Sequence, residues 1–155
     1  LLIHSKNSAE DISSVLDNLK SQGCEIIGCS HLKDIYSIDR DATEEDWSTE
    51  YLDKKITVKL VDNVEECVEH INKYSSGHTE SCLSNNQQSI EYFFQNCKSA
   101  ILMNNASTQF ADGGEFGFGA EIGISTDKLH VRGPVGAKHL TTFKYQVIGN
   151  HTTRP

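Results

Sequence analysis

The chain has 155 residues, which is enough for one domain with its own hydrophobic core. Hydrophobic residues make up 37% of the chain and charged residues 23%, as in globular proteins, and no apolar run approaches the roughly 20 residues of a membrane span. The formal net charge of -8 argues against nucleic acid and against an anionic membrane as partners, because both bind basic surfaces.

The cysteines favour a reducing compartment, and we expect the protein to be cytoplasmic. There are five of them, an odd number without the paired short spacing of a zinc site, so neither a disulfide framework nor a metal site is expected. The histidines show no metal-binding spacing either. Because the chain begins with Leu rather than Met, we expect it to be the carboxyl-terminal piece of a longer protein.

Strand and helix patterns alternate along most of the chain. Ser8 and Asn63 are predicted N-caps, and Gly23 is placed to end the first helix. We predict strands over residues 1–4, 25–29, 55–61, 79–83 and 100–103, helices over residues 8–23, 63–75 and 86–97, and a turn or two of helix over residues 31–36. The acidic run from Asp39 to Asp46 is interpreted as a solvated loop. This alternation predicts an α/β fold with a mostly parallel sheet.

The segment 104–137 stands apart because seven of the eleven glycines lie between Gly113 and Gly136. No helical or strand periodicity is visible there, so we predict an ordered loop that follows the carboxyl end of a strand, where α/β proteins bind ligands. The G-x-G-x-x-G spacing of a dinucleotide fingerprint is not kept. Glycines beside small neutral donors suit an anion-binding surface, and the donors are Asn105, Ser107, Thr108, Ser125 and Thr126.

Three runs in this segment resemble gamma-glutamyl phosphate reductase, the proline-biosynthetic branch of the aldehyde dehydrogenase superfamily. They are Asn105-Ala-Ser-Thr-Gln-Phe-Ala-Asp-Gly-Gly, Phe116-Gly-Phe-Gly-Ala-Glu-Ile-Gly-Ile-Ser-Thr and His130-Val-Arg-Gly-Pro-Val-Gly. The resemblance runs nearly from Leu1 to Arg154. It departs at Gln109, where the family usually has Arg, and at Val131, where it usually has Ala.

The resemblance implies a fold and an assembly. Residues 1–139 would be the downstream part of an aldehyde dehydrogenase catalytic domain, with a mostly parallel three-layer sheet. Residues 140–155 would be an oligomerisation strand and tail, in which residues 140–148 pair with the sheet of a neighbouring subunit. The complete protein would be a homo-oligomer, with possible functional coupling to glutamate 5-kinase.

The resemblance also implies a reaction. The enzyme reduces L-glutamate 5-phosphate to L-glutamate 5-semialdehyde and phosphate with NADPH as cofactor, through a cysteine thioester. The family's nucleophilic Cys lies upstream of the segment that matches Leu1, so this chain carries no catalytic residue and we expect it to be inactive alone. Its own cysteines are interpreted as small buried hydrophobes.

Several residues match positions that would bind substrate or cofactor. Gly123, Ser125 and Thr126 would hold the substrate's α-carboxylate. Arg132 is a second candidate anion anchor, or else a structural Arg that binds loop carbonyls or Glu121. Asn105, Ser107 and Thr108 would face the acyl phosphate, or else cap their own loop.

His78 and Glu50 are further candidates. His78 precedes its strand and would polarise substrate, or else serve as a structural hydrogen-bonding residue. Glu50 lies where the superfamily places the Glu that holds the nicotinamide ribose, although Tyr51-Leu-Asp follows it instead of the usual Phe-Gly-Pro. A different class of function remains open: a non-catalytic, truncated copy that acts at most as a metabolite-binding or oligomerisation module.

Overall fold

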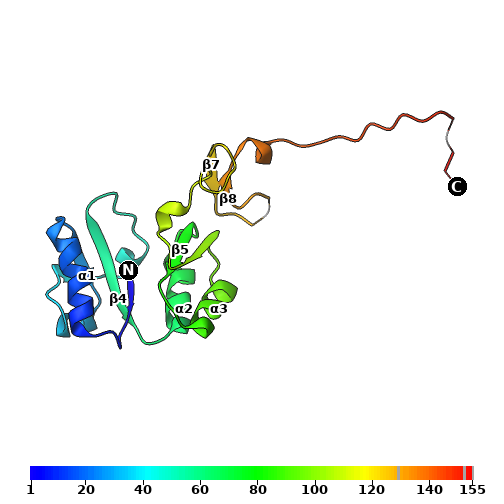
Figure 1. Ribbon diagram of the computed structural model, residues 1–155. Coiled ribbons are helices and arrows are strands. Elements are labelled where there is room, and N and C mark those ends of the chain that lie inside the picture. The colour runs from blue at the N-terminus through cyan, green and yellow to red at the C-terminus, as the bar shows by residue number, and fades with distance from the viewer. Residues whose placement is uncertain (129, 152, 155) are drawn as a thin grey trace.

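The computed structural model describes residues 1–128, 130–151 and 153–154. An α/β body is followed by a small hairpin and then by a long extended tail (Figure 1). The helices are α1 (Ala9–Ser21), α2 (Val64–Tyr74) and α3 (Gln87–Asn96), with short 3-10 helices η1 (Ser30–Asp34), η2 (Glu45–Trp47), η3 (Thr108–Phe110) and η4 (Ala137–Leu140). The strands are β1 (Leu2–His4), β2 (Glu25–Gly28), β3 (Arg40–Asp41), β4 (Lys55–Val61), β5 (Thr79–Cys82), β6 (Ile101–Asn104), β7 (Gly123–Ser125) and β8 (Gly133–Val135).

The three α-helices each begin at a polar side chain that accepts a hydrogen bond from the first turn. Ser8 accepts from the Asp11 amide, Asn63 from Glu66 and Asn86 from Ser89, at 3.1, 2.8 and 3.0 Å. Each such cap stabilises its helix by about 1 kcal/mol. Gly23 follows α1 in the left-handed region at φ 79°, which glycine adopts without strain. The caps predicted at Ser8 and Asn63 are therefore confirmed.

The sheets of the body are parallel, as the alternation of strand and helix predicted. Four strands lie in the order β1-β4-β2-β3, and all three pairings are parallel. Ile3 lies opposite Leu60, and Ile26 opposite Ile56. Strands β5 and β6 form a second parallel pair, and β7 and β8 form an antiparallel one.

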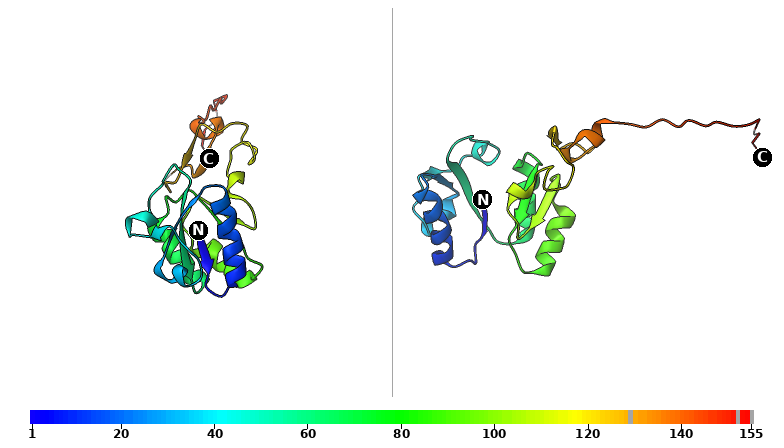
Figure 2. Two further views of the ribbon diagram at one scale, coloured as in Figure 1. Left: turned by 90° about the vertical axis from the view of Figure 1, so that its left-hand side faces the viewer. Right: turned by 45° about the horizontal axis from the view of Figure 1, so that its top comes forward.

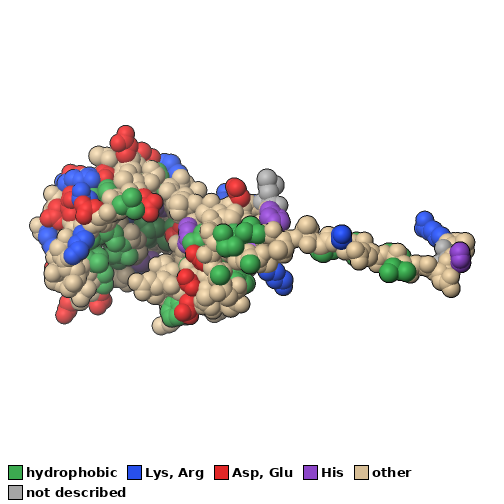
Figure 3. Space-filling view, turned by 90° about the horizontal axis from the view of Figure 1, so that it is seen from above, with side chains coloured by type: hydrophobic (Ala, Val, Ile, Leu, Met, Phe, Trp, Pro, Cys, Tyr) green, Lys and Arg blue, Asp and Glu red, His purple; other side chains and the backbone are tan. Residues whose placement is uncertain are grey.

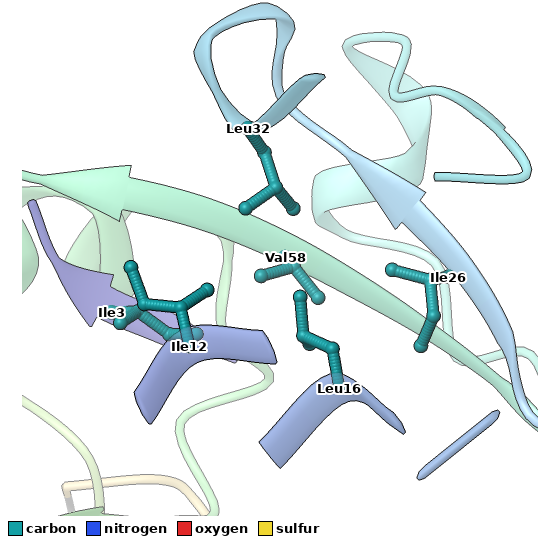
Figure 4. Packing of buried hydrophobic residues seen from close by; sticks show 6 residues of the cluster. All are labelled: Ile3, Ile12, Leu16, Ile26, Leu32 and Val58. Atoms are coloured by element: carbon teal, nitrogen blue, oxygen red, sulfur yellow. The ribbon is translucent and has the colours of Figure 1, made fainter. Parts of the chain in front are cut away.

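The main core lies between α1 and the four-stranded sheet. Ile12 and Leu16 of α1 are almost fully buried against β-strand residues such as Ile26 and Val58, and Leu32 of η1 joins the same cluster (Figure 4). Burial of one such aliphatic side chain contributes roughly 1.5–3 kcal/mol. This cluster attaches α1 to one face of the sheet.

Helix α2 covers the other face of the sheet. Successive side chains of a strand point to opposite faces, so Thr57 points away from α1 if Val58 points toward it. Thr57 lines a cavity together with His70 and Ile71 of α2. A second apolar cluster, built on Val68, Phe93 and Cys97, holds α2 and α3 against β5 and β6. Helices thus lie on both sides of the strands, in three layers.

One sequence-based prediction is corrected, and another stays a prediction. The segment 104–137 contains η3 and the β7–β8 hairpin rather than loop alone, because these elements are three residues long and too short to show a period. Leu140 ends η4, and the described residues after it are exposed and belong to no strand of this chain. The strand over residues 140–148, which would pair with a neighbouring subunit, stays a prediction, because β-branched and aromatic residues form a strand where a neighbouring strand completes the ladder.

The tail leaves the body as a single extended segment, and hydrophobic side chains lie along it (Figure 3). Its large apolar residues are solvent-exposed, and Val147 and Ile148 are 92% and 98% exposed. Among the described residues, no helix is both long and apolar enough to span a bilayer.

Candidate functional site

Asn105 lies where the chain leaves β6, and its side chain joins two loops. The amide donates to the Ser84 carbonyl at 2.9 Å and accepts from the Ser84 N–H at 3.0 Å. Its backbone is left-handed at φ 51°, a region that Asn tolerates better than most residues. Both polar atoms of Asn105 are therefore engaged with the backbone after β5, as the capping interpretation predicts.

The residues after Asn105 form the start of η3. Ser107 caps this short helix, accepting a hydrogen bond from the Gln109 amide at 3.2 Å. Thr108 and Gln109 are solvent-exposed on it. Around the carboxyl ends of β5 and β6, the hydroxyl of Thr108 is accordingly the candidate side chain most accessible to a ligand.

The glycine-rich loop closes on itself through Glu121. Its carboxylate accepts a hydrogen bond from the buried Gly113 amide at 2.9 Å, and the Phe118 amide donates to the Gly113 carbonyl at 2.8 Å. A Cβ at Gly113 would lie 3.0 Å from the Glu121 Cβ, which is closer than side chains normally approach. Glu121 therefore shapes the loop, a role that the sequence analysis did not assign to it.

The hairpin carries the predicted carboxylate-binding residues, which the structure spreads along one strand. Gly123 is opposite Val135, and Ser125 is opposite Gly133. Gly123 is exposed and Ser125 is half-buried. The exposed Thr126 lies 3.9 Å from the position that a Cβ would take on Gly77, so it lies beside the start of β5.

Arg132 and His78 lie at this same end of β5 and β6. The Arg132 guanidinium donates to the carbonyl of Lys98, just ahead of β6. This contact matches the alternative in which Arg132 is a structural residue that binds a loop carbonyl. Glu121 is engaged by Gly113 instead. His78 is half-buried, and its Nδ1 is hydrogen-bonded to the Thr79 hydroxyl.

The substrate candidates therefore form two groups rather than one. Thr126, Arg132 and His78 gather where β5 and β6 begin, whereas Asn105 and Ser107 lie where these strands end. In a parallel sheet, the beginnings and the ends of the strands lie at opposite ends of the sheet. Local sequence spacing could not show this division, because it depends on how the hairpin folds back over β6.

The acidic run contains a buried carboxylate, which corrects its interpretation as a solvated loop. Asp46 is 7% exposed. Arg40 binds both of its oxygens, at 2.7 and 2.5 Å, and Tyr51 donates to it at 2.6 Å. The Thr43 amide and hydroxyl complete the set at 2.7 and 2.8 Å. The Arg40 guanidinium, followed by Tyr51, holds the Asp46 pKa well below its usual range.

The Asp46 network fixes the segment that carries Glu50. Burial and the Asp46 hydrogen bond raise the pKa of Tyr51 to about 12, so this phenol stays protonated and keeps donating. Glu50 itself is exposed beside it. Because Glu50 is exposed and its segment is held in place, its carboxylate is suited to accept hydrogen bonds from the two hydroxyls of a diol.

The cysteines are not set up as nucleophiles. Burial raises the pKa of Cys67 to about 11 and also raises that of Cys82, while Cys97 is buried in the α2–α3 cluster. Cys24 and Cys29 pack against the α1 core. Reactive cysteines need a lowered pKa and access to solvent. These positions fit small hydrophobic residues.

The fold and the site define an α/β domain with parallel sheets and a glycine-rich polar loop beyond them. No protein-family model matches the chain. It is 51% identical to a gamma-glutamyl phosphate reductase of Brucella suis over 154 residues, which are 99% of this chain and 37% of that protein. A gamma-glutamyl phosphate reductase of Thermotoga petrophila is 48% identical over the same shares.

A solved structure shows the same relationship. The crystal structure of gamma-glutamyl phosphate reductase from Thermotoga maritima matches with a TM-score of 0.92 and 47% identity, over 100% of this chain and 37% of that one. The resemblance read from the sequence is therefore confirmed: the chain is homologous to gamma-glutamyl phosphate reductase. It spans about 37% of the length of these relatives.

Proposed function

We propose that this chain forms the substrate-binding part of an NADPH-dependent reductase that converts L-glutamate 5-phosphate to L-glutamate 5-semialdehyde and phosphate in proline biosynthesis. The observation that carries the proposal is 51% identity to gamma-glutamyl phosphate reductase over 99% of the chain, joined to a closely matching fold. The match covers 37% of the relatives, so the remaining parts of the site come from polypeptide outside residues 1–155.

The reaction would use groups of this chain and groups of the polypeptide outside residues 1–155. An external cysteine thiolate attacks the acyl carbon, phosphate leaves, and the resulting thioester accepts a hydride to release the aldehyde and the thiolate. Buried, weakly acidic thiols in this chain agree with an external nucleophile. NADPH, when bound, supplies the hydride. Glu50, which is exposed, would accept hydrogen bonds from its ribose hydroxyls.

This chain would supply contacts to the two charged ends of the substrate. At one end of β5 and β6, Thr126 and Arg132 offer a hydroxyl and a cation for a carboxylate, supported by Gly123 and Ser125 of β7 and with His78 nearby. At the other end, Thr108 offers an exposed hydroxyl beside the fixed Asn105 and Ser107. Substitutions made separately in the two sets of residues would show which set binds substrate.

Assembly through the tail belongs to the same proposal. Residues 140–155, of which 152 and 155 lie outside the described residues, would pair with a neighbouring subunit of the complete homo-oligomer. The exposed apolar side chains of the tail support this role, because such residues are normally covered in a folded assembly. Coupling to glutamate 5-kinase would then deliver the unstable acyl phosphate directly.

The test is NADPH oxidation driven by freshly generated glutamate 5-phosphate, with the chain joined to the remainder of a gamma-glutamyl phosphate reductase. We expect turnover that disappears when the external cysteine is replaced by alanine, and no turnover from residues 1–155 alone. A folded, NADPH-binding assembly without turnover would contradict the proposal. It would favour the alternative, a non-catalytic module that binds metabolites or partners.

A further inference from the structure

The short helix η4 lies where the chain leaves the hairpin for the tail. In the views of Figures 1 and 2, the hairpin and η4 stand between the α/β body and the extended tail. Strand β8 ends at Val135, and Gly136 directly precedes η4. The glycine-rich loop, residues 113–121, leads into β7, which pairs with β8 in the antiparallel sense. The pairing therefore brings the end of the loop beside the start of η4.

Gly136 allows the backbone of the loop to approach η4 closely. A Cβ on residue 136 would lie 2.9 Å from the Ala120 carbonyl oxygen and 3.3 Å from the Phe118 carbonyl oxygen. Both are backbone atoms, which cannot turn aside as the end of a flexible side chain could. Gly136 is buried, and its φ of -100° is open to any residue. Glycine is therefore required here by the available space rather than by the backbone conformation.

His139 holds this contact from the side of η4. Its Nδ1 accepts a hydrogen bond from the Gly136 N–H at 2.9 Å, and its own N–H donates to the Gly136 carbonyl at 3.0 Å. The first bond is the one that Glu or Gln makes in a capping box, three residues after the N-cap. The imidazole also meets the Phe118 ring edge to face, with the ring centroids 5.0 Å apart. His139 thus joins η4, Gly136 and the glycine-rich loop.

The same contact reaches the strand that carries the predicted carboxylate-binding residues. The Ile122 N–H donates to the carbonyl of Val135, the residue before Gly136, at 2.7 Å. Gly123 follows directly and begins β7. Residues 114–124 are all solvent-exposed, so few buried contacts hold them in place. The contact with η4 is therefore well suited to fix where β7 lies.

We propose that His139 is a positioning residue, which holds the glycine-rich loop against Gly136 and thereby keeps β7 where it can bind substrate. The half-buried imidazole acts through Phe118 and Gly136 and needs no contact with a ligand. For its effect on substrate, the inference rests on the proposed function. A displacement of about 1 Å far from the reacting atoms can lower a rate by about 100-fold, so holding the loop has consequences for binding and turnover.

The first experiment follows amide hydrogen exchange in the free chain by NMR and needs no catalysis. In His139→Ala both the acceptor and the ring are lost, so we expect the Phe118 and Ile122 amides to exchange at least about tenfold faster than in wild type. The Cys29 amide, which is hydrogen-bonded within the body, is the internal reference and should change little. Lys138→Ala, at an exposed neighbouring position of η4, is the matched control.

Further variants separate the two contacts of His139. His139→Gln keeps an acceptor for the Gly136 N–H, as in capping boxes, and loses the ring, whereas His139→Phe keeps the ring and loses the acceptor. Each should loosen the loop less than His139→Ala does. Gly136→Ala should also loosen it, because its methyl group would meet the Ala120 carbonyl oxygen. Gly123→Ala is the steric control for exchange, since its methyl group would meet no described atom within 4 Å.

The second experiment measures kinetics with the chain joined to the remainder of a gamma-glutamyl phosphate reductase. His139→Ala should raise the KM for freshly generated glutamate 5-phosphate at least about fivefold and leave kcat within about twofold, because the imidazole does not contact the reacting atoms. His139→Gln should recover part of the change in KM. Lys138→Ala should keep both constants. A merely structural role would reduce the amount of active protein and leave KM unchanged.

Two results would overturn the inference. One is unchanged exchange of the Phe118 and Ile122 amides in both His139→Ala and Gly136→Ala, and the other is faster exchange with an unchanged KM. Circular dichroism shows whether each variant is folded, and if His139→Ala is not, the Gln and Phe variants decide in its place. A wild-type assembly without turnover would contradict the proposed function, while exchange in the free chain would still decide whether His139 holds the loop.

Discussion

Asp46 and Glu121 are both carboxylates, but they have different hydrogen-bond partners in the tertiary structure. Asp46 is surrounded by donors from Arg40, Thr43 and Tyr51, whereas Glu121 binds one loop amide at Gly113. A hydrogen bond to a charged group is worth about 1.5–3 kcal/mol, more than a neutral one.

Replacement of Asp46 by asparagine should destabilise the fold. The amide side chain would keep the shape but lose the charge that Arg40 binds through both nitrogens, so we expect the free energy of unfolding to fall by about 2 kcal/mol. Urea denaturation measures it. Asp41→Asn is the control, because the exposed Asp41–Lys33 pair should contribute less than about 1 kcal/mol. Equal losses in both variants would contradict the special role of Asp46.

The stability that Asp46 provides should depend on pH. Its folded-state pKa lies below the value of about 3.9 expected in the unfolded chain, so its contribution is complete above that value. As pH falls below about 4, the unfolded chain gains the proton first and the contribution is lost. The difference between wild type and Asp46→Asn should therefore be constant from about pH 5 to 7 and shrink below about 4. A difference independent of pH down to about 2 would refute this linkage.

Removal of the Glu121 carboxylate should loosen the glycine-rich loop without unfolding the body. In Glu121→Ala the buried Gly113 amide loses its acceptor, so its hydrogen exchange should accelerate about tenfold. Glu115→Ala, in the same loop, is the control for loss of a carboxylate. If Gly113 exchanges at the wild-type rate in Glu121→Ala, the loop is held by other contacts.

At the scale of elements, polar caps and short ladders decide where each helix and strand begins and ends. The caps are local, which is why Ser8 and Asn63 could be recognised from residue type and position. The β7–β8 hairpin depends on pairing between two strands of three residues, which are too short to show a period. Caps are therefore the most predictable features of this chain, and the hairpin is among the least.

The Asn63 cap provides a quantitative test for α2. Asn63→Ala removes the acceptor of the Glu66 amide, so we expect a loss of about 1 kcal/mol in the free energy of unfolding. Asn63→Asp retains an acceptor at the helix N-terminus and should remain within a few tenths of wild type. Thermal and urea unfolding of the three proteins would measure these differences. A neutral Asn63→Ala would show that packing alone sets the start of α2.

At the scale of the whole molecule, the body and the tail differ in how much apolar surface they bury. The body has two apolar clusters, one under α1 and one between α2 and α3. The described residues after η4 are exposed. Stability should therefore reside in the body, and association in the tail.

Truncation after Leu140 tests this division. Removal of residues 141–155 should leave the free energy of unfolding of the free chain within about 0.5 kcal/mol, since few of its contacts are lost. In the complete assembly, the same truncation should reduce the subunit number found by light scattering. An unchanged subunit number would exclude the tail as the oligomerisation strand, whatever its effect on solubility.

The sequence by itself determined the helices with their caps, the parallel strands and the resemblance to gamma-glutamyl phosphate reductase, because periodicity, capping residues and motifs are local in the chain. Only the tertiary structure decided which carboxylate is buried, since Asp46 depends on Arg40 and Tyr51 being brought around it. It likewise placed Arg132 and Asn105 at opposite ends of β5 and β6. These features arise where segments distant in sequence meet, and no local pattern records which segments will meet.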